Sequence, residues 1–269
     1  MKFGNLVLGA LSASCILWAT VTTASGDDAA QSATPTVSPT APPSKTVTTE
    51  IRDVLFGDLP LEKWPMNSAG VAHAEPWASF LKVRKQLQAG QHPEAIRTLR
   101  RVLSMRNLES RHYLQAWHFL RGLGVQPTKA EAKHVYGVVV EVALPEGLDI
   151  VAAYADGSAR YFNYSGAAVI WEKPDDSLKG QIQSLLQAGQ KTANKIGPWL
   201  KERPPAPATG ESRITMLTPS GLHFGQAPMD VLAADPLAKP VFDAATQLML
   251  ALIGKQQKAP KQKAQRSSS

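Results

Sequence analysis

Ser220 and His223 are the two residues whose types and spacing come nearest to a catalytic pair. A histidine that takes the proton of a serine hydroxyl makes the serine a nucleophile, provided that a third group orients the imidazole and a pocket stabilises the oxyanion. The surrounding Thr-Pro-Ser-Gly segment (218–221) differs from the Gly-x-Ser-x-Gly pattern of one large hydrolase class. A serine in a turn explains the same residues, and we favour that interpretation over a hydrolase.

The remaining histidines and acids show no metal-binding pattern. No His-Glu-x-x-His arrangement occurs, and His112 and His118, six residues apart, fall on different faces of a helix. Asp156 fits a β-turn, while Asp175 and Asp176 fit the N-terminus of a helix, where carboxylates pair with free N–H groups. Glycine-rich phosphate or dinucleotide loops are also absent from the sequence. We therefore expect neither a metal nor a cofactor.

A second candidate site lies on a strand expected over residues 159–164. Its residues are Arg160, Tyr161, Phe162 and Tyr164. Strand alternation places Tyr161 on one face of the sheet and the other three on the opposite face. One face should pack on a helix, and the other would form a recognition surface for a small ligand or a protein if nothing covered it. The alternative, a sheet covered on both faces, is the one that we favour.

The elements that position these residues follow from periodicity. Alternating apolar residues and turn signals such as Asp156-Gly157 predict an antiparallel four-stranded meander. Its strands are expected at 136–144, 148–154, 159–164 and 167–172. An amphipathic helix should follow at 178–196, then short strands at 213–218 and 222–225, and a last helix at 241–252 that ends at Gly254.

The preceding part of the chain has helical periodicity from Trp77 onward. Helices are expected around residues 77–87, 95–103 and 113–120, and the capping-box spacing of Thr128 and Glu131 predicts a fourth. The fold class is therefore α+β, with helical hairpins followed by an antiparallel meander packed with helices. The corresponding domains are a helical subdomain (51–136) and a sheet with helices (137–254).

Two resemblances accompany this assignment. Gly90 and Ala95 are spaced like the turn glycine and packing alanine of tetratricopeptide repeats, so the hairpin at about 77–106 resembles one such repeat. An ordinary helical hairpin is the alternative that we favour, because no repeat at a 34-residue period follows. The stretch from Gly137 to Phe224 resembles exported bacterial proteins of no assigned function.

The first residues indicate export. Lys2 precedes an apolar run over residues 3–21 and the small residues at 22–25, the order of a signal peptide (1–24). The signal peptide could be cleaved after Ala24 or after Gly26. Alternatively, it could remain as an uncleaved membrane anchor. A lipid anchor on Cys15, the only cysteine, is disfavoured because Ser12 stands where a branched apolar residue is expected. We expect a periplasmic protein, or one anchored in the inner membrane and facing the periplasm.

Charge and composition separate a linker and a tail from the folded part. Residues 25–50 are rich in Thr, Pro, Ala and Ser, which predicts a disordered linker. The chain has 29 basic and 22 acidic residues, a net charge of +7, of which the expected disordered tail (255–269) carries five. The tail has no aromatic residues between its lysines, so we expect no nucleic-acid partner. Membrane contact would come only from an uncleaved leader or weakly from the tail.

These observations favour a non-enzymatic envelope interaction or scaffold protein that binds an unidentified envelope protein or small ligand. A small-ligand sensor that uses the meander face and a hydrolase that uses Ser220 and His223 remain the alternatives.

Overall fold

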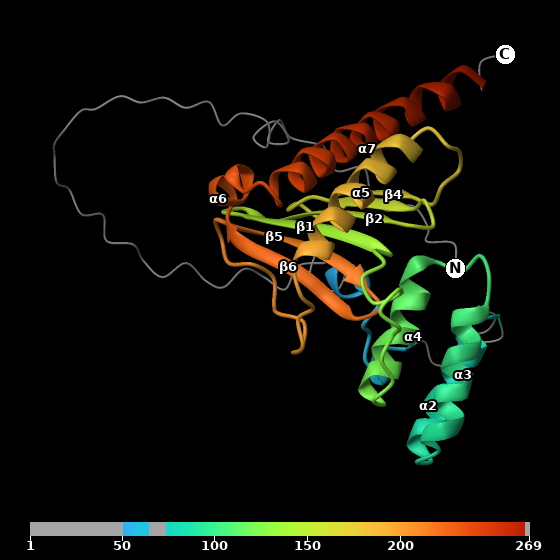
Figure 1. Cartoon of the computed structure of the whole chain (residues 1–269). Coiled ribbons are helices and arrows are strands. Elements are labelled where there is room, and N and C mark those ends of the chain that lie inside the picture. The colour runs from blue at the N-terminus through green and yellow to red at the C-terminus, as the bar shows by residue number, and fades with distance from the viewer. Residues whose placement is uncertain (1–50, 65–73, 267–269) are drawn as a thin grey trace, which may run out of the picture.

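A computed structural model of the chain, drawn in Figure 1, describes residues 51–64 and 74–266. The predicted signal peptide (1–24), which includes Cys15, and the predicted linker (25–50) lie outside the described residues. Within the described part, none of the helices combines the length and apolar character that a membrane span requires.

Six antiparallel strands form one sheet in the order β4-β3-β2-β1-β5-β6. The strands are β1 Gly137–Leu144, β2 Gly147–Tyr154, β3 Ala159–Phe162, β4 Ala168–Trp171, β5 Glu211–Thr218 and β6 Gly221–Pro228. The predicted α+β class and the four-stranded meander are confirmed. The hairpin of β5 and β6 extends the same sheet, since β5 pairs with β1 in a register that places Glu141 opposite Arg213.

Two long helices cover one face of the sheet, which we call the back face (Figure 1). These helices are α5 (Lys179–Lys195) and α7 (Lys239–Arg266), and the short α6 (Met229–Ala234) precedes α7. Alternate strand side chains such as Val138 and Met216 pack there against helix side chains such as Leu185 and Leu248. Gly189 allows α5 to approach closely, because a Cβ atom at this position would lie 2.5 Å from Val138 Cγ2.

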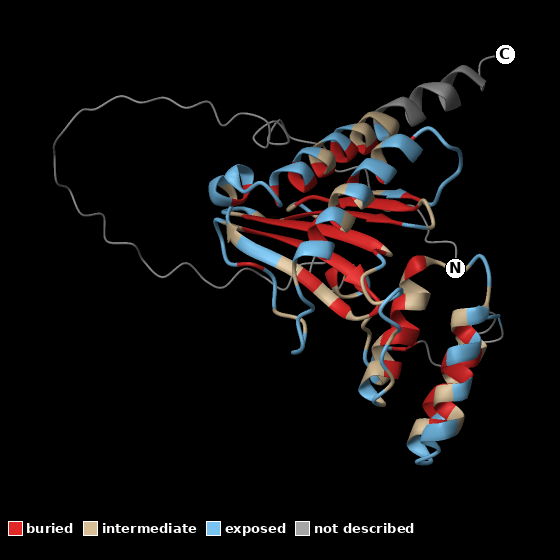
Figure 2. Cartoon of the chain, in the orientation of Figure 1, coloured by how far each residue is buried: buried red, intermediate tan, exposed pale blue. Residues whose placement is uncertain are grey.

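The opposite face, which we call the front face, is covered by the N-terminal segment (residues 51–59) and by α4 (Ser110–Gly122). Leu55, Phe56 and Leu114 pack there on the other set of strand side chains. The N-terminal segment also turns against α4 at Gly57, whose φ is +66° and whose added Cβ would lie 2.7 Å from Leu114 Cβ. Both faces of the central strands β1, β2, β3 and β5 are therefore buried, as Figure 2 shows, whereas the edge strands β4 and β6 are partly exposed.

A helical hairpin extends from α4 away from the sheet. It consists of α2 (Trp77–Gln88) and α3 (His92–Ser104), and the short 3-10 helix η2 (Leu61–Lys63) precedes it. Leu99 and Val102 of α3 and Leu120 of α4 share a third apolar cluster with Trp64 and Phe80. The helical hairpin predicted at 77–106 is therefore present, and α4 connects its core to the front face of the sheet.

Two expectations about helix ends are wrong. Thr128 and Glu131 form the expected capping contacts, but residues 128–134 make only turns and no fourth helix follows. The chain has only a few residues there before it must become extended as β1 at Gly137. At the other end, α7 continues past Gly254 to Arg266. One glycine costs a helix only about 1 kcal/mol, so Gly254 alone does not end it.

Candidate functional site

The aromatic candidate surface is covered. The exposed fractions of Arg160, Tyr161 and Phe162 are 5%, 1% and 4%, and Tyr164 is half-buried. Tyr161 packs on the back face and Phe162 on the front face, as strand alternation requires. The structure therefore has the covered sheet that we favoured, and these four residues form no open recognition surface, because the N-terminal segment and α4 cover the face that would need to be open.

Contacts within the fold occupy the polar atoms of the same residues. The Arg160 guanidinium forms an ion pair with Glu172 and lies 5.5 Å from the centre of the Tyr154 ring. The Tyr161 hydroxyl donates a hydrogen bond of 3.1 Å to Asp149, and the Tyr164 N–H donates one of 2.8 Å to the same carboxylate. These groups hold the meander together.

The structure brings Ser220 and His223 together, since Ser220 Oγ lies 3.0 Å from His223 Nε2. The third group on the imidazole is a backbone carbonyl, because Nδ1 lies 3.1 Å from the oxygen of Ile196. His223 is fully buried, and burial lowers its pKa from the ordinary value despite the bond to Ile196. A carbonyl orients the ring, but it supplies no negative charge to stabilise an imidazolium as the aspartate of a triad does.

Competing acceptors surround the hydroxyl of Ser220. Its Oγ donates a 2.6 Å hydrogen bond to the carbonyl of Ala132 and also lies 3.0 Å from the hydroxyl of Thr218. One proton cannot serve these acceptors and His223 together. The contacts join the turn after β5 to the loop before β1 and to the end of α5. This geometry suits a structural connection better than an activated nucleophile.

A cleft of about 500 Å³ opens on the front side of the molecule, and we call it the front cleft. It lies between the N-terminal segment, α4, the loop at 199–203 and the turn between β5 and β6. Its size falls in the range of small-molecule sites. The apolar and aromatic residues that line it are Phe56, Leu114, Phe119, Trp199, Leu200 and Leu222.

The rim of the front cleft exposes large apolar side chains. Leu200 is 88% exposed and Trp199 is 39% exposed, whereas most residues of this size in the described fold are buried. The backbone of Trp199 is held in place by a bridge to Leu222 on the edge strand β6, and its indole N–H donates to the Glu202 carbonyl. The loop therefore presents its apolar side chains from a fixed backbone.

The pKa values of two arginines in the front cleft, Arg203 and Arg121, are shifted in opposite directions. For Arg203, burial alone would lower the pKa, but ion pairs with Asp58 at 2.7 Å and Asp53 at 3.0 Å outweigh it and raise the pKa. For Arg121, burial outweighs the opposing charge of Asp58 and lowers the pKa to about 10. Its Nη1 donates to the Pro219 carbonyl at 2.6 Å, and among the described residues it forms no ion pair. Arg121 is thus a partly desolvated cation without a paired anion.

His118 and Asp58 lie near Arg121 in the same cleft. Burial and the charges of Arg121 and Arg203 lower the pKa of His118, and the charge of Asp58 opposes that shift only in part. One Asp58 oxygen pairs with Arg203, while the other, Oδ1, is buried and has no hydrogen-bond partner in the part of the chain that the structure describes.

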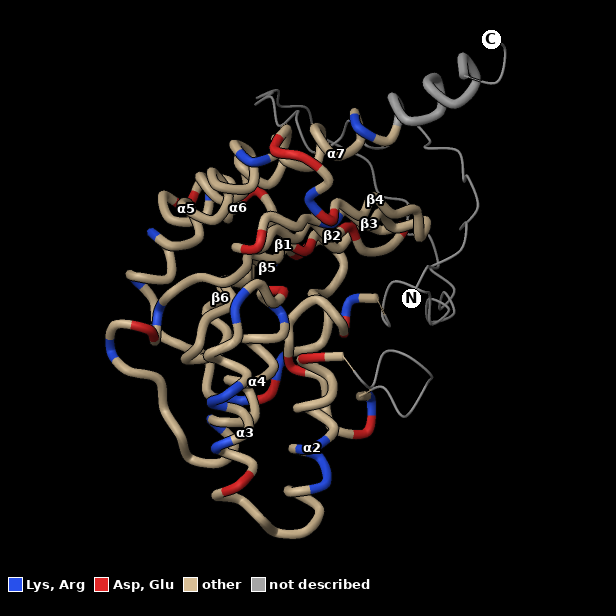
Figure 3. The backbone as a smooth tube through the Cα atoms, turned by 90° about the vertical axis from the view of Figure 1, so that its right-hand side faces the viewer, with Lys and Arg blue, Asp and Glu red and all other residues tan. Residues whose placement is uncertain are grey.

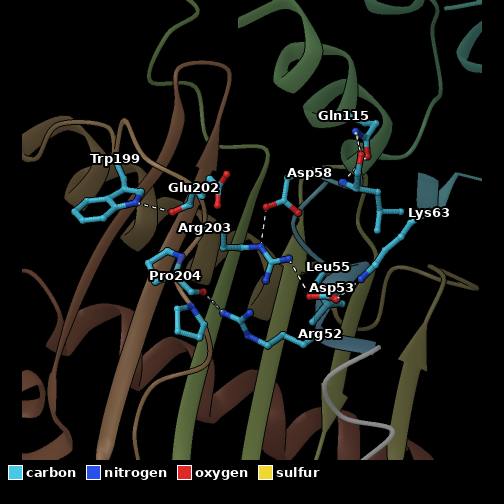
Figure 4. A network of polar contacts seen from close by, with 12 residues as sticks. Arg52, Asp53, Leu55, Asp58, Lys63, Gln115, Trp199, Glu202, Arg203 and Pro204 are labelled. Atoms are coloured by element: carbon cyan, nitrogen blue, oxygen red, sulfur yellow. Dashed lines mark hydrogen bonds and ion pairs between the residues drawn. The ribbon is translucent and has the colours of Figure 1, made fainter. Parts of the chain in front are cut away.

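A network of buried polar contacts fixes the loop that forms one wall of the cleft, and Figure 4 shows the contacts of Arg203 with Asp53 and Asp58 and of Arg52 with the Pro204 carbonyl. Arg52 of the N-terminal segment pairs with Glu141 of β1, and Arg213 of β5 approaches the same carboxylate at 3.6 Å. Both arginines also donate to the carbonyl of Pro204, at 3.2 and 3.4 Å. Glu141 is fully buried, so its charge is balanced only by these partners. The network fastens the N-terminal segment and the 199–205 loop to the sheet.

Sequence reasoning missed the residues that build this site. Glu141 is a single acid within the valine-rich stretch of β1, a pattern that indicates a buried ion pair. The Trp-Leu pair at 199–200, directly after Gly197-Pro198, was a signal for an exposed apolar loop. Nothing in the sequence distinguishes Arg121 from an ordinary helix-end cation, because its burial depends on segments distant along the chain.

Acidic and basic positions are interspersed along the described backbone (Figure 3). Among the described residues, no group of three or more His, Cys, Asp or Glu side chains is placed to hold a metal ion. Comparison of the chain with protein-family models, curated proteins and solved structures gives no match.

Proposed function

We propose that this protein is an exported, non-enzymatic binding protein of the cell envelope, and that the front cleft is its binding site. The observation that carries the proposal is Arg121, a partly buried cation without an ion pair, in a cleft of about 500 Å³ that the exposed Trp199 and Leu200 also line. Unpaired buried charge costs free energy that a stable fold would otherwise avoid, and such costs are typical of functional sites.

The architecture supports binding rather than catalysis at this position. Aromatic and apolar side chains line the cleft together with polar and charged side chains such as Arg121, His118 and Asp58, and the ionic network holds the surrounding segments in place. These are the features of a preformed ligand site. The signal peptide expected from the sequence supports a ligand or partner in the envelope.

The proposal can be tested by photo-crosslinking in cells with the full chain and its own leader. A photoreactive phenylalanine derivative replaces Leu200 at the rim, and a matched chain carries it at Ile170, which is 57% exposed on β4 at the opposite edge of the sheet. A discrete adduct formed at position 200 and absent at position 170 is the expected result. Equal labelling at both positions, or none at position 200, would contradict a binding site in the front cleft.

A hydrolase at Ser220 and His223 is the second candidate, since their 3.0 Å contact is the distance that general-base activation requires. Its test is reaction with a fluorophosphonate probe, with Ser220→Ala as the control. Labelling of the native chain that Ser220→Ala abolishes would support the hydrolase. We expect no labelling, because His223 is buried and the Ala132 carbonyl accepts the serine proton.

A further inference from the structure

We propose that the front cleft binds a ligand through its carboxylate, with Arg121 as the anion-binding residue and an apolar group of the ligand against the aromatic wall. This inference rests on the proposed function and names the ligand chemistry of the same site. The chemistry is that of a peptide's C-terminal residue or of a single N-acylated amino acid.

The charged residues that line the front cleft are not equal in number. The basic residues are Arg121, Lys201 and Arg203, and the acidic residues are Asp58 and Glu202. Three basic residues against two acidic ones leave one positive charge in excess among the residues that line the cleft. A carboxylate carries one negative charge and would balance it, whereas a phosphate near pH 7 carries up to two and would leave the cleft with an excess of negative charge.

The position of Arg121 favours a planar anion. Nη1 is held by the Pro219 carbonyl, which fixes the guanidinium while other N–H groups remain available for donation. The turn of the β5–β6 hairpin runs beside it, because a Cβ atom at Gly221 would lie 3.9 Å from Arg121 Nε. A guanidinium that is fixed in place and partly desolvated binds a carboxylate with two parallel hydrogen bonds.

The aromatic and apolar walls of the front cleft provide a surface for the apolar group of the ligand. Phe119 and Leu222 line the cleft, and Trp199 stands at its rim with its ring centroid 5.1 Å from that of Phe224. The ammonium of Lys201 lies 5.6 Å from the centre of the Trp199 ring, which places a second cation at the entrance. An apolar side chain next to the carboxylate would therefore meet an aromatic surface while the anion enters beside positive charge.

The test is isothermal titration calorimetry of the full chain with matched probes. The probes are N-acetyl-leucine, its amide N-acetyl-leucinamide, a pentapeptide that ends in a leucine carboxylate, the amide of that peptide, and inorganic phosphate. We expect the carboxylate probes to bind about tenfold or more tightly than their amides, since a charge-assisted pair is lost in the amides. Tighter binding of the pentapeptide would identify a peptide terminus, and equal binding of both carboxylates a single acylated amino acid.

Two variants locate the effect. Arg121→Met removes the charge and keeps much of the chain length, and should abolish the preference for carboxylate over amide. Arg100→Met removes an exposed cation of α3 and should leave the preference unchanged. Equal binding of carboxylates and amides, no binding of any probe at millimolar concentration, or stronger binding of phosphate would overturn the inference. An adduct at position 200 would still support the binding function in each of those cases.

Discussion

The two faces of the sheet are built in different ways. The back face is covered by the regular helices α5 and α7, whose apolar side chains interdigitate with those of the strands. The front face is covered by a short irregular segment, a helix and a loop, and it contains the buried charges of Arg52, Glu141 and Arg213. The difference indicates that the back face mainly stabilises the fold, while the front face uses ion pairs to hold irregular segments around a cleft.

The largest expected effect concerns the charge at the centre of the front face. Glu141→Ala leaves Arg52 and Arg213 buried without their counter-charge, and loss of one partner from a buried ion pair costs about 3–5 kcal/mol. Urea unfolding of the variant and the native chain measures this difference. Glu202→Ala, at the rim of the cleft, is the control and should change stability by less than about 0.5 kcal/mol. A loss below about 1 kcal/mol for Glu141→Ala would show that the network contributes little.

The next effect tests the close packing of the back face. Gly189→Ala places a methyl group 2.5 Å from Val138 Cγ2, so α5 must move away from the sheet, at a cost of about 1–3 kcal/mol. Gly180→Ala in the same helix is the matched control, because no atom lies within 4 Å of its added Cβ. It should be neutral or stabilise the fold by up to about 1 kcal/mol. Equal effects in thermal unfolding would argue against tight packing at Gly189.

The sequence predicted the sheet better than the site, for physical reasons. Strands and turns leave local signals, such as the alternation through Ile150, Ala152 and Tyr154 before the Asp156-Gly157 turn. The N-terminal segment has no such local signal for its structure, because Pro60 follows a short apolar run that has no clear periodicity. Its place on the sheet depends on the pairing of Arg52 with Glu141, 89 residues away, which no local pattern encodes.

The difference between local and long-range signals also explains why the sequence predicted the contact of Ser220 with His223 but not the burial of Arg160 and Phe162. The proximity of Ser220 and His223 follows from a tight turn between two predicted strands, so local reasoning placed them together correctly. The burial of Arg160 and Phe162 required knowledge of what packs on the front face, and this is a long-range property. Arg121 likewise belongs to the front cleft only because the loop at 199–203, distant along the chain, lines the same cleft.

A smaller effect should appear in the pH dependence of stability. Burial lowers the pKa of His223 in the folded protein, so its neutral form stabilises the fold at pH values above the unfolded pKa of about 6.5. That contribution is lost as the pH falls from about 6.5 through the folded pKa, at up to about 1.4 kcal/mol for each unit of difference. His223→Gln should flatten the stability profile between pH 6.5 and 5 relative to the native chain. Parallel profiles would mean that His223 is not held neutral.

The smallest expected effect is on the stability of the Arg121→Met variant. Arg121 is partly desolvated and has no ion pair, so its replacement by an apolar side chain should leave the free energy of unfolding within about 0.5 kcal/mol of the native value or raise it slightly. Chemical denaturation measures this. A loss above about 2 kcal/mol would assign Arg121 a structural role equal to that of the buried network.

The most direct test of the account combines the rim crosslinker with that substitution. Chains that carry the photoreactive residue at position 200 are expressed with either arginine or methionine at position 121, and their adducts are compared in the same cells. The account predicts a discrete adduct with Arg121 that is lost or reduced about tenfold with methionine, while both chains remain folded. An adduct of undiminished yield in the methionine chain would contradict the assignment of the front cleft as a binding site that depends on Arg121.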